Sequence, residues 1–202
     1  DYNGSLGSGV TWVPGKFGQA IEFDGSDNPS SNVTFPAGTG DVGDKISLSV
    51  WVKETTTGGY LISNKSANAN AGYMLYTAGS DTKVNWRGGG NTARNIDASP
   101  SWASGNWHHI VLTVNAGGTN NSKLYADGTY RTQKTIEAVT NGSANLTLGR
   151  NPAGGNRFIG ALDDLRIYDK VLSATDVSAI YNAGSGDFIT TIAGNSAIVK
   201  KA

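Results

Sequence analysis

The segment FIGALDDLRIYDKVLSATDVSAIYNAG, residues 158–184, predicts a β-strand followed by a short helix. Its first part alternates small or apolar residues in the way a half-buried strand does, and the strand is expected over 157–168. Ser173 and Asp176 have the spacing of a capping box, which marks a helix start. Gly184 is a residue typical of the position just after a helix. We therefore expect a helix of about ten residues that begins after Ser173.

Two acidic residues, Asp163 and Asp164, lie side by side in the middle of this strand. In a regular strand, successive side chains point to opposite faces, so Asp163 is predicted to share a face with Ala161 and Leu165. A buried carboxylate without a partner costs several kcal/mol. The sequence therefore predicts that Asp163 has a specific partner.

The rest of the chain predicts an all-β protein. The 202 residues include 28 glycines and 5 prolines, and short runs of β-branched and aromatic residues alternate with turn residues. In ISLSVWVK (46–53), Ile46, Leu48, Val50 and Val52 share one face, as expected of a strand that packs on a core. Strands are expected at 19–24, 31–35, 46–53, 59–63, 72–77, 82–87, 92–97, 107–115, 122–126, 130–136, 145–149 and 157–168. The expected fold class is an antiparallel two-sheet β-sandwich with one short C-terminal helix.

The composition excludes several function classes. Lys plus Arg (16) equals Asp plus Glu (16), so we expect neither nucleic acid nor an anionic membrane as a partner. The sequence has no run of 18 apolar residues, so membrane insertion is not expected. It has no cysteine, which excludes disulfides and thiolate metal sites. The first residues resemble neither a signal peptide nor an initiator sequence, which suggests a segment of a longer or processed protein.

Three segments together resemble the laminin-G-like, concanavalin A-like jelly-roll family. They are GKFGQAIEFDGSDN (15–28), then ISLSVWVK with GNWHHIVLTVN (105–115) and KLYADGTYR (123–131), and finally the segment at 158–184. The resemblance covers about residues 1–184 in family order. It implies one jelly-roll domain over 1–184, with 185–202 a linker or the start of a following domain. Members of this family are extracellular or displayed at a cell surface, so the same is expected here.

The resemblance also implies a structural calcium ion, because many members hold one between the early Phe-Asp-Gly turn and the closing strand. Calcium binds carboxylate and carbonyl oxygens. The candidate metal ligands are Asp24, Asp27, Asp163 and Asp164. The alternative is that Asp163 accepts hydrogen bonds from the backbone or from Arg166 and that no metal binds.

Non-catalytic members of the family bind glycans or proteins. Sugars are held by aromatic rings together with amide, carboxylate and guanidinium groups, and two polar segments, 72–97 and 149–157, carry such residues. The candidate ligand-binding residues are Tyr73, Tyr76, Trp86, Arg87, Asn91, Arg94, Arg150, Asn151 and Asn156. The alternative is that Trp86 and one of the two tyrosines pack in the core.

Catalysis is not expected. Glu22, Asp24 and Asp27 only partly resemble the acidic strand of the glucanases in this family, because Asp27 lies beyond a predicted turn at Gly25. The two histidines, His108 and His109, follow Trp107 in a largely apolar predicted strand, so a structural role in packing is expected for them. The sequence thus predicts a non-catalytic carbohydrate-binding module of a larger extracellular protein, with a glycan and the neighbouring domains of the same chain as partners. The alternatives are a spacer or protein-binding domain of an adhesin or virion appendage and, less favoured, a polysaccharide lyase or glycoside hydrolase domain.

Overall fold

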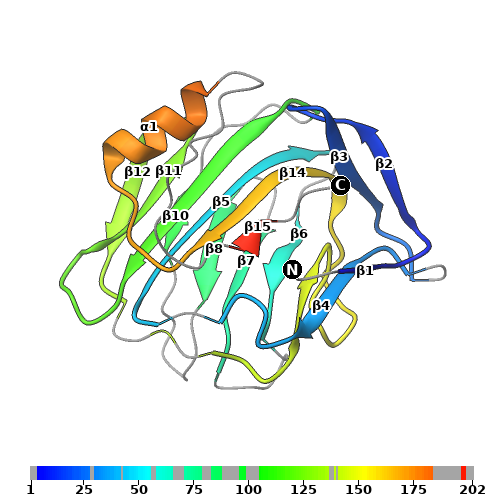
Figure 1. Ribbon diagram of the computed structural model, residues 1–202, viewed down its shortest axis with the longest axis horizontal. Helices are drawn as coiled ribbons and strands as arrows, with labels where there is room; N and C mark the ends of the chain where they lie inside the picture. The colour runs from blue at the N-terminus through cyan, green and yellow to red at the C-terminus, as the bar shows by residue number, and fades with distance from the viewer. Residues whose placement is uncertain are drawn as a thin grey trace.

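A computed structural model describes residues 4–27, 30–41, 43–55, 58–65, 71–78, 83–87, 96–98, 105–136, 139, 141–183 and 197–198. Two antiparallel sheets pack face to face in this part of the chain (Figure 1). The strands of the first sheet, in spatial order, are β1 (Ser5–Leu6), β4 (Val33–Ala37), β13 (Asn145–Leu148), β6 (Gly59–Ser63), β7 (Met74–Ala78), β8 (Lys83–Arg87) and β9 (Asp97–Ala98). Those of the second sheet are β12 (Thr129–Lys134), β11 (Ser122–Ala126), β10 (His108–Asn115), β5 (Lys45–Glu54), β14 (Ile159–Tyr168), β3 (Gln19–Asp24) and β2 (Val10–Pro14). The predicted two-sheet sandwich is confirmed.

The core lies between the two sheets. Ile46, Leu48, Val50 and Val52 of β5 are each at most 1% exposed and face it, as their alternation predicts. The first sheet contributes Leu75 of β7 and Tyr73, which lies just before this strand, among others. The opposite face of β5 carries Ser47, Ser49 and Trp51, which point away from the first sheet.

The acid pair of β14 lies at a β-bulge. Asp163 pairs with Trp51 of β5, but the next pair is Arg166 with Ser49, so β14 has one more residue than β5 at this point. Asp164 takes a left-handed backbone conformation with φ 47°, which absorbs the extra residue. The bulge changes the alternation of side chains: Leu162 and Leu165 both face the core, and Asp163 shares the outer face with Trp51.

The sequence-based prediction that Asp163 lies among the core side chains is therefore wrong. It assumed a regular strand, and the inserted residue breaks that regularity. Both carboxylates have partners outside the core. Asp163 accepts hydrogen bonds from the backbone N–H groups of Phe17 (2.8 Å) and Asp164 (2.7 Å), and Arg166 Nε donates to Asp164 Oδ1 (2.8 Å).

Substitutions at Asp164 test the bulge. Asp164→Gly and Asp164→Ala both remove the ion pair with Arg166, but only alanine has to hold a side chain at φ 47°. We expect the alanine variant to have a free energy of unfolding about 1 kcal/mol lower than the glycine variant. Urea unfolding of the two proteins measures this difference, and an alanine variant at least as stable as the glycine variant would contradict the bulge.

A single helix in the described residues, α1 (Ala174–Asn182), lies beside β10, β11 and β12 on the outer face of the second sheet (Figure 1). The predicted capping box is present, because Ser173 Oγ accepts from Asp176 N (3.1 Å) and Asp176 Oδ2 accepts from Ser173 N (2.8 Å). Val177 and Ile180 pack with Val111 of β10 and the aromatic ring of Tyr125 in β11. No helix within the described residues has the length and hydrophobicity needed to span a membrane.

The last described segment, β15 (Ala197–Ile198), pairs with Arg166 and Ile167 of β14. It lies within the part of the chain that the sequence assigns to a linker or a following domain. The boundary at residue 184 stays a prediction.

Candidate functional site

Two stacked tyrosines lie on the outer face of the first sheet. Tyr60 of β6 pairs with Tyr76 of β7 across the strands, and their ring centroids are 5.3 Å apart with the planes 18° from parallel. Leu75 and Thr77, the neighbours of Tyr76, are buried, and Leu75 faces the core, so Tyr76 points outward. Both tyrosines are half-buried. The pair, here called the tyrosine platform, therefore presents aromatic surface to the solvent.

The loop of residues 149–157 lies against the start of β6. The backbone N–H of Tyr60 donates to the carbonyl oxygen of Asn156 over 2.9 Å. The contact is close because residue 59 is glycine: a Cβ at Gly59 would lie 2.6 Å from the carbonyl oxygen of Arg157. The polar residues of this loop are therefore held beside the tyrosine platform.

The three predicted ligand residues of this loop have different surroundings. Asn151 is buried and folds the loop itself, because its Oδ1 accepts from Gly155 N over 3.0 Å. Asn156 is exposed. Arg150 is half-buried, and its Nε is enclosed with no hydrogen-bond partner among the described residues. Of these three residues, Asn156 is therefore the one whose side chain is exposed to solvent, and Arg150 is exposed only in part.

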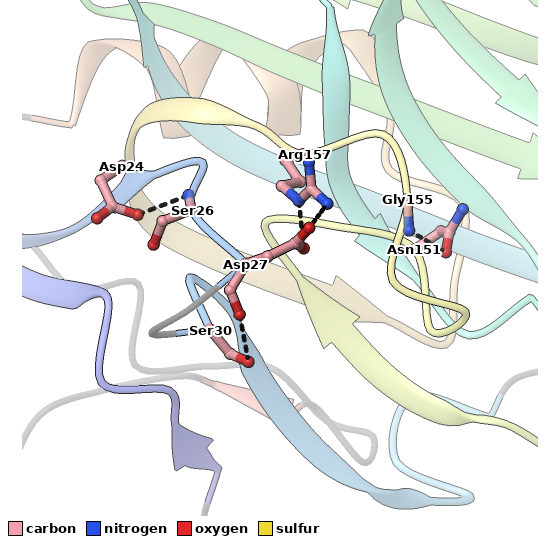
Figure 2. A network of polar contacts seen from close by, with 7 residues as sticks. All are labelled: Asp24, Ser26, Asp27, Ser30, Asn151, Gly155 and Arg157. Carbon is pink, nitrogen blue, oxygen red and sulfur yellow. Dashed lines mark hydrogen bonds and ion pairs between the residues drawn. The ribbon is translucent and has the colours of Figure 1, made fainter.

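The loop is tied to the turn that follows β3 by an ion pair between Arg157 and Asp27. Arg157 Nε donates to Asp27 Oδ1 over 2.6 Å, and the second guanidinium nitrogen contacts Oδ2. Figure 2 shows the two side chains facing each other between the loops, with Asn151 and Gly155 on one side and Asp24 and Ser26 on the other. Asp24 Oδ1 accepts from Ser26 N (2.8 Å), and this bond holds the pKa of the exposed Asp24 carboxyl below its usual range.

The four predicted calcium ligands are not brought together. Asp24 pairs with Ile159, and Asp163 lies four residues further along β14, a separation of about 13 Å along the strand. Asp27 and Asp164 are each bound by an arginine. Asp163 is occupied by the backbone N–H groups of Phe17 and Asp164. Among the described residues, no three acidic or histidine side chains form a group that could hold a metal.

These four acids therefore do not fit one calcium ion. Calcium binding by other oxygen atoms of the chain stays a prediction.

The sequence-based prediction for Tyr73 is wrong. Its side chain is in the core, where its hydroxyl donates to the carbonyl oxygen of Gly40 over 2.8 Å and burial raises its pKa. Tyr76 is placed on the outer face as a ligand residue requires. The predictions for Asn91, Arg94 and the side chains of Trp86 and Arg87 lie outside the described residues.

Tyr60 was not among the predicted site residues. A signal for it exists in the sequence, because 59–63 and 72–77 are successive predicted strands and an antiparallel pairing brings Tyr60 near Tyr76. Its exact partner could not be predicted, since Leu61 forms a bulge that shifts the register between the two strands.

Both histidines have structural roles. His109 is fully buried and stacks on Trp51 with centroids 4.9 Å apart, while its Nε2 lies 2.9 Å from Ser49 Oγ. Burial lowers its pKa to about 4, so the ring is neutral at pH 7. His108 Nδ1 lies 2.9 Å from Asp127 Oδ2. The prediction that His109 packs inside the molecule is confirmed.

The comparison with protein families agrees with this architecture. A model described as the concanavalin A-like lectin/glucanases superfamily, of the laminin G type, matches residues 24–178. The chain belongs to this superfamily. The resemblance inferred from the sequence is thereby confirmed.

One relative of known identity is a much longer protein. The adhesion G-protein coupled receptor V1 of Danio rerio is 26% identical over 147 residues, which cover 67% of this chain and 2% of the receptor. The chain thus corresponds to a small part of that protein.

Among solved structures, domain 4 of an extracellular GH43 arabinanase from Geobacillus stearothermophilus, in complex with arabinotriose, has a TM-score of 0.70 and 23% identity. The alignment covers 89% of this chain and 88% of that domain. The binding domain of Paraclostridial Mosquitocidal Protein 1 has a TM-score of 0.67 and 18% identity, over 90% of this chain and 47% of that one. At these identities the structures show a shared fold.

Proposed function

We propose that this domain is a non-catalytic carbohydrate-binding module and that it binds glycans on the tyrosine platform. The observation that carries the proposal is the stacked pair of Tyr60 and Tyr76, which faces outward beside a loop of polar residues. Aromatic rings bind the C–H faces of sugars, and the hydroxyl groups then need polar partners at the edge of the ring surface. The side chains of Arg150 and Asn156 would supply them.

The comparisons support this proposal at the level of the fold. One similar structure was solved with arabinotriose bound, and another is the receptor-binding domain of botulinum neurotoxin type G. His109 is buried in β10 of the second sheet, away from the tyrosine platform on the first sheet, and this placement supports a non-catalytic role. An extracellular or cell-surface location follows from the same proposal.

Loss of either platform tyrosine is expected to weaken glycan binding about tenfold, because a ring stacked on a sugar contributes about 1–1.5 kcal/mol. The ligand is first identified on a glycan array that includes arabino-oligosaccharides. Isothermal titration calorimetry then compares the wild type with Tyr60→Ala and Tyr76→Ala. Tyr130→Ala is the matched control, because Tyr130 is 48% exposed on β12 of the second sheet.

The proposal fails if no glycan binds, or if the platform variants bind as tightly as the Tyr130 variant. In the first case, a spacer or protein-binding domain becomes the better interpretation. The receptor relative favours this second function, since the matching segment is a small part of a large adhesion protein.

A further inference from the structure

We infer that Arg157 is a positioning residue for the proposed glycan site. Its ion pair with Asp27 links the Phe-Asp-Gly turn to the start of the closing strand, which is the link that the family resemblance predicts for calcium. The inference rests on the proposed function for its effect on glycan binding. Its structural part, that the ion pair fixes the loop against β6, can be tested without a ligand.

The ion pair joins two segments that are far apart in the sequence. Asp27 follows the Phe-Asp-Gly turn after β3, and Arg157 immediately precedes the segment that enters β14, 130 residues later. Both nitrogens that a guanidinium offers on one edge contact the two carboxylate oxygens. This two-pronged geometry fixes direction as well as distance, which a single contact does not.

The backbone next to Arg157 contacts the start of β6, the strand that carries Tyr60. The carbonyl of Asn156, one residue before, accepts the hydrogen bond from Tyr60 N, and the carbonyl of Arg157 lies against Gly59. Asp27 is thus connected to Tyr60 by two contacts, its ion pair with Arg157 and the hydrogen bond between Asn156 O and Tyr60 N. If the guanidinium releases Asp27, residues 156 and 157 lose their side-chain link to the β3 turn and are held there by the strand pairing of Ile159 with Asp24. The edge of the platform then loses one of its supports.

The ion pair also occupies the carboxylate of Asp27, which was one of the candidate calcium ligands. The cation beside Asp27 is the Arg157 guanidinium, which comes from the chain itself and is present at any calcium concentration. Because the two side chains are 35% and 59% exposed, the pair is screened by salt and contributes little to global stability. Its effect is therefore expected to be local.

Hydrogen exchange of the Tyr60 amide, followed by NMR, tests the structural part. We expect about threefold to fivefold faster exchange of this amide in Arg157→Gln and in Asp27→Asn, with no further increase in the double variant. Arg157→Lys keeps the charge but loses the second contact, so an intermediate rate is expected. Arg131→Gln, an exposed arginine on β12, is the control. Addition of CaCl2 is expected to leave the wild-type rate unchanged.

Titration of the glycan identified on the array tests the functional part. Arg157→Gln is expected to lower the affinity about threefold to fivefold while the melting temperature stays within about 2 °C of the wild type. An unchanged Tyr60 exchange rate in Arg157→Gln would overturn the inference, as would slower wild-type exchange on adding calcium. Faster exchange with unchanged affinity would overturn the positioning role. If the wild type binds no glycan, the proposed function fails, and the exchange experiment alone decides whether Arg157 holds the loop.

Discussion

Replacement of Trp51 by alanine is expected to lower the free energy of unfolding by about 3–5 kcal/mol. Trp51 is 3% exposed on the outer face of β5, between the second sheet and the end of α1. Its ring stacks on His109 at 4.9 Å and on Tyr181 at 5.5 Å, and the edge of Phe17 contacts it at 5.7 Å. The substitution removes the central ring of this cluster, and the surrounding strands can close the cavity only in part.

Urea unfolding of the wild type and Trp51→Ala measures this loss. Trp12→Ala is the matched control, because Trp12 is 36% exposed on β2 and its loss is expected to cost less than about 1 kcal/mol. A Trp51 variant that loses no more than the Trp12 variant would show that this cluster does not hold the helix to the sheet.

The protein is expected to lose about 3 kcal/mol of stability as the pH falls from about 6.5 to about 4, because of His109. Burial of the imidazole lowers its folded-state pKa from 6.5 to about 4, so the unfolded state binds the proton first. The stabilisation from the neutral, buried ring is complete above pH 6.5 and is lost as the pH falls through the folded-state pKa. Protonation at low pH would place a charged imidazolium in the buried stack with Trp51, which is unfavourable.

Unfolding by urea across this pH range tests the prediction. His109→Gln is expected to lose most of the pH dependence between 6.5 and 4, although it is also less stable at pH 7 because the stack is gone. The same slope in His109→Gln and the wild type would assign the acid sensitivity to other groups.

The regular parts of the fold could be predicted from local sequence patterns. The alternation in ISLSVWVK predicts the inner face of β5 and its bounds to within one residue at each end, and the Ser173–Asp176 spacing predicts the start of α1 to within one residue. Asp127-Gly128 predicts the hairpin between β11 and β12, and both residues have the positive φ that this turn requires. In each case the decisive information lies within about ten residues of chain.

The irregular parts could not be predicted in the same way. A bulge at Asp164 reverses which face the following residues occupy, and nothing in DDLR distinguishes a bulged strand from a regular one. The strand β2 was missed because its residues are largely exposed and its last residue is proline, so that it lacks a buried face.

The candidate site depends on contacts between distant segments. The Asp27–Arg157 pair spans 130 residues, and no local pattern favours Arg157 over a metal ion as the partner of Asp27. Tyr73 and Tyr76 both lie in the predicted strand 72–77, but Tyr73, just before β7, is buried in the core, whereas Tyr76 of β7 is half-buried on the outer face. Residue types thus indicated the chemistry of the site, while strand register decided which residues take part.

Binding on the tyrosine platform is tested most directly by an NMR titration of protein labelled in its tyrosine rings with the best glycan from the array. The account predicts saturable shifts of the Tyr60 and Tyr76 ring signals, with those of Tyr125 and Tyr130 on the second sheet unchanged. Saturable binding that leaves the Tyr60 and Tyr76 rings unaffected would contradict it.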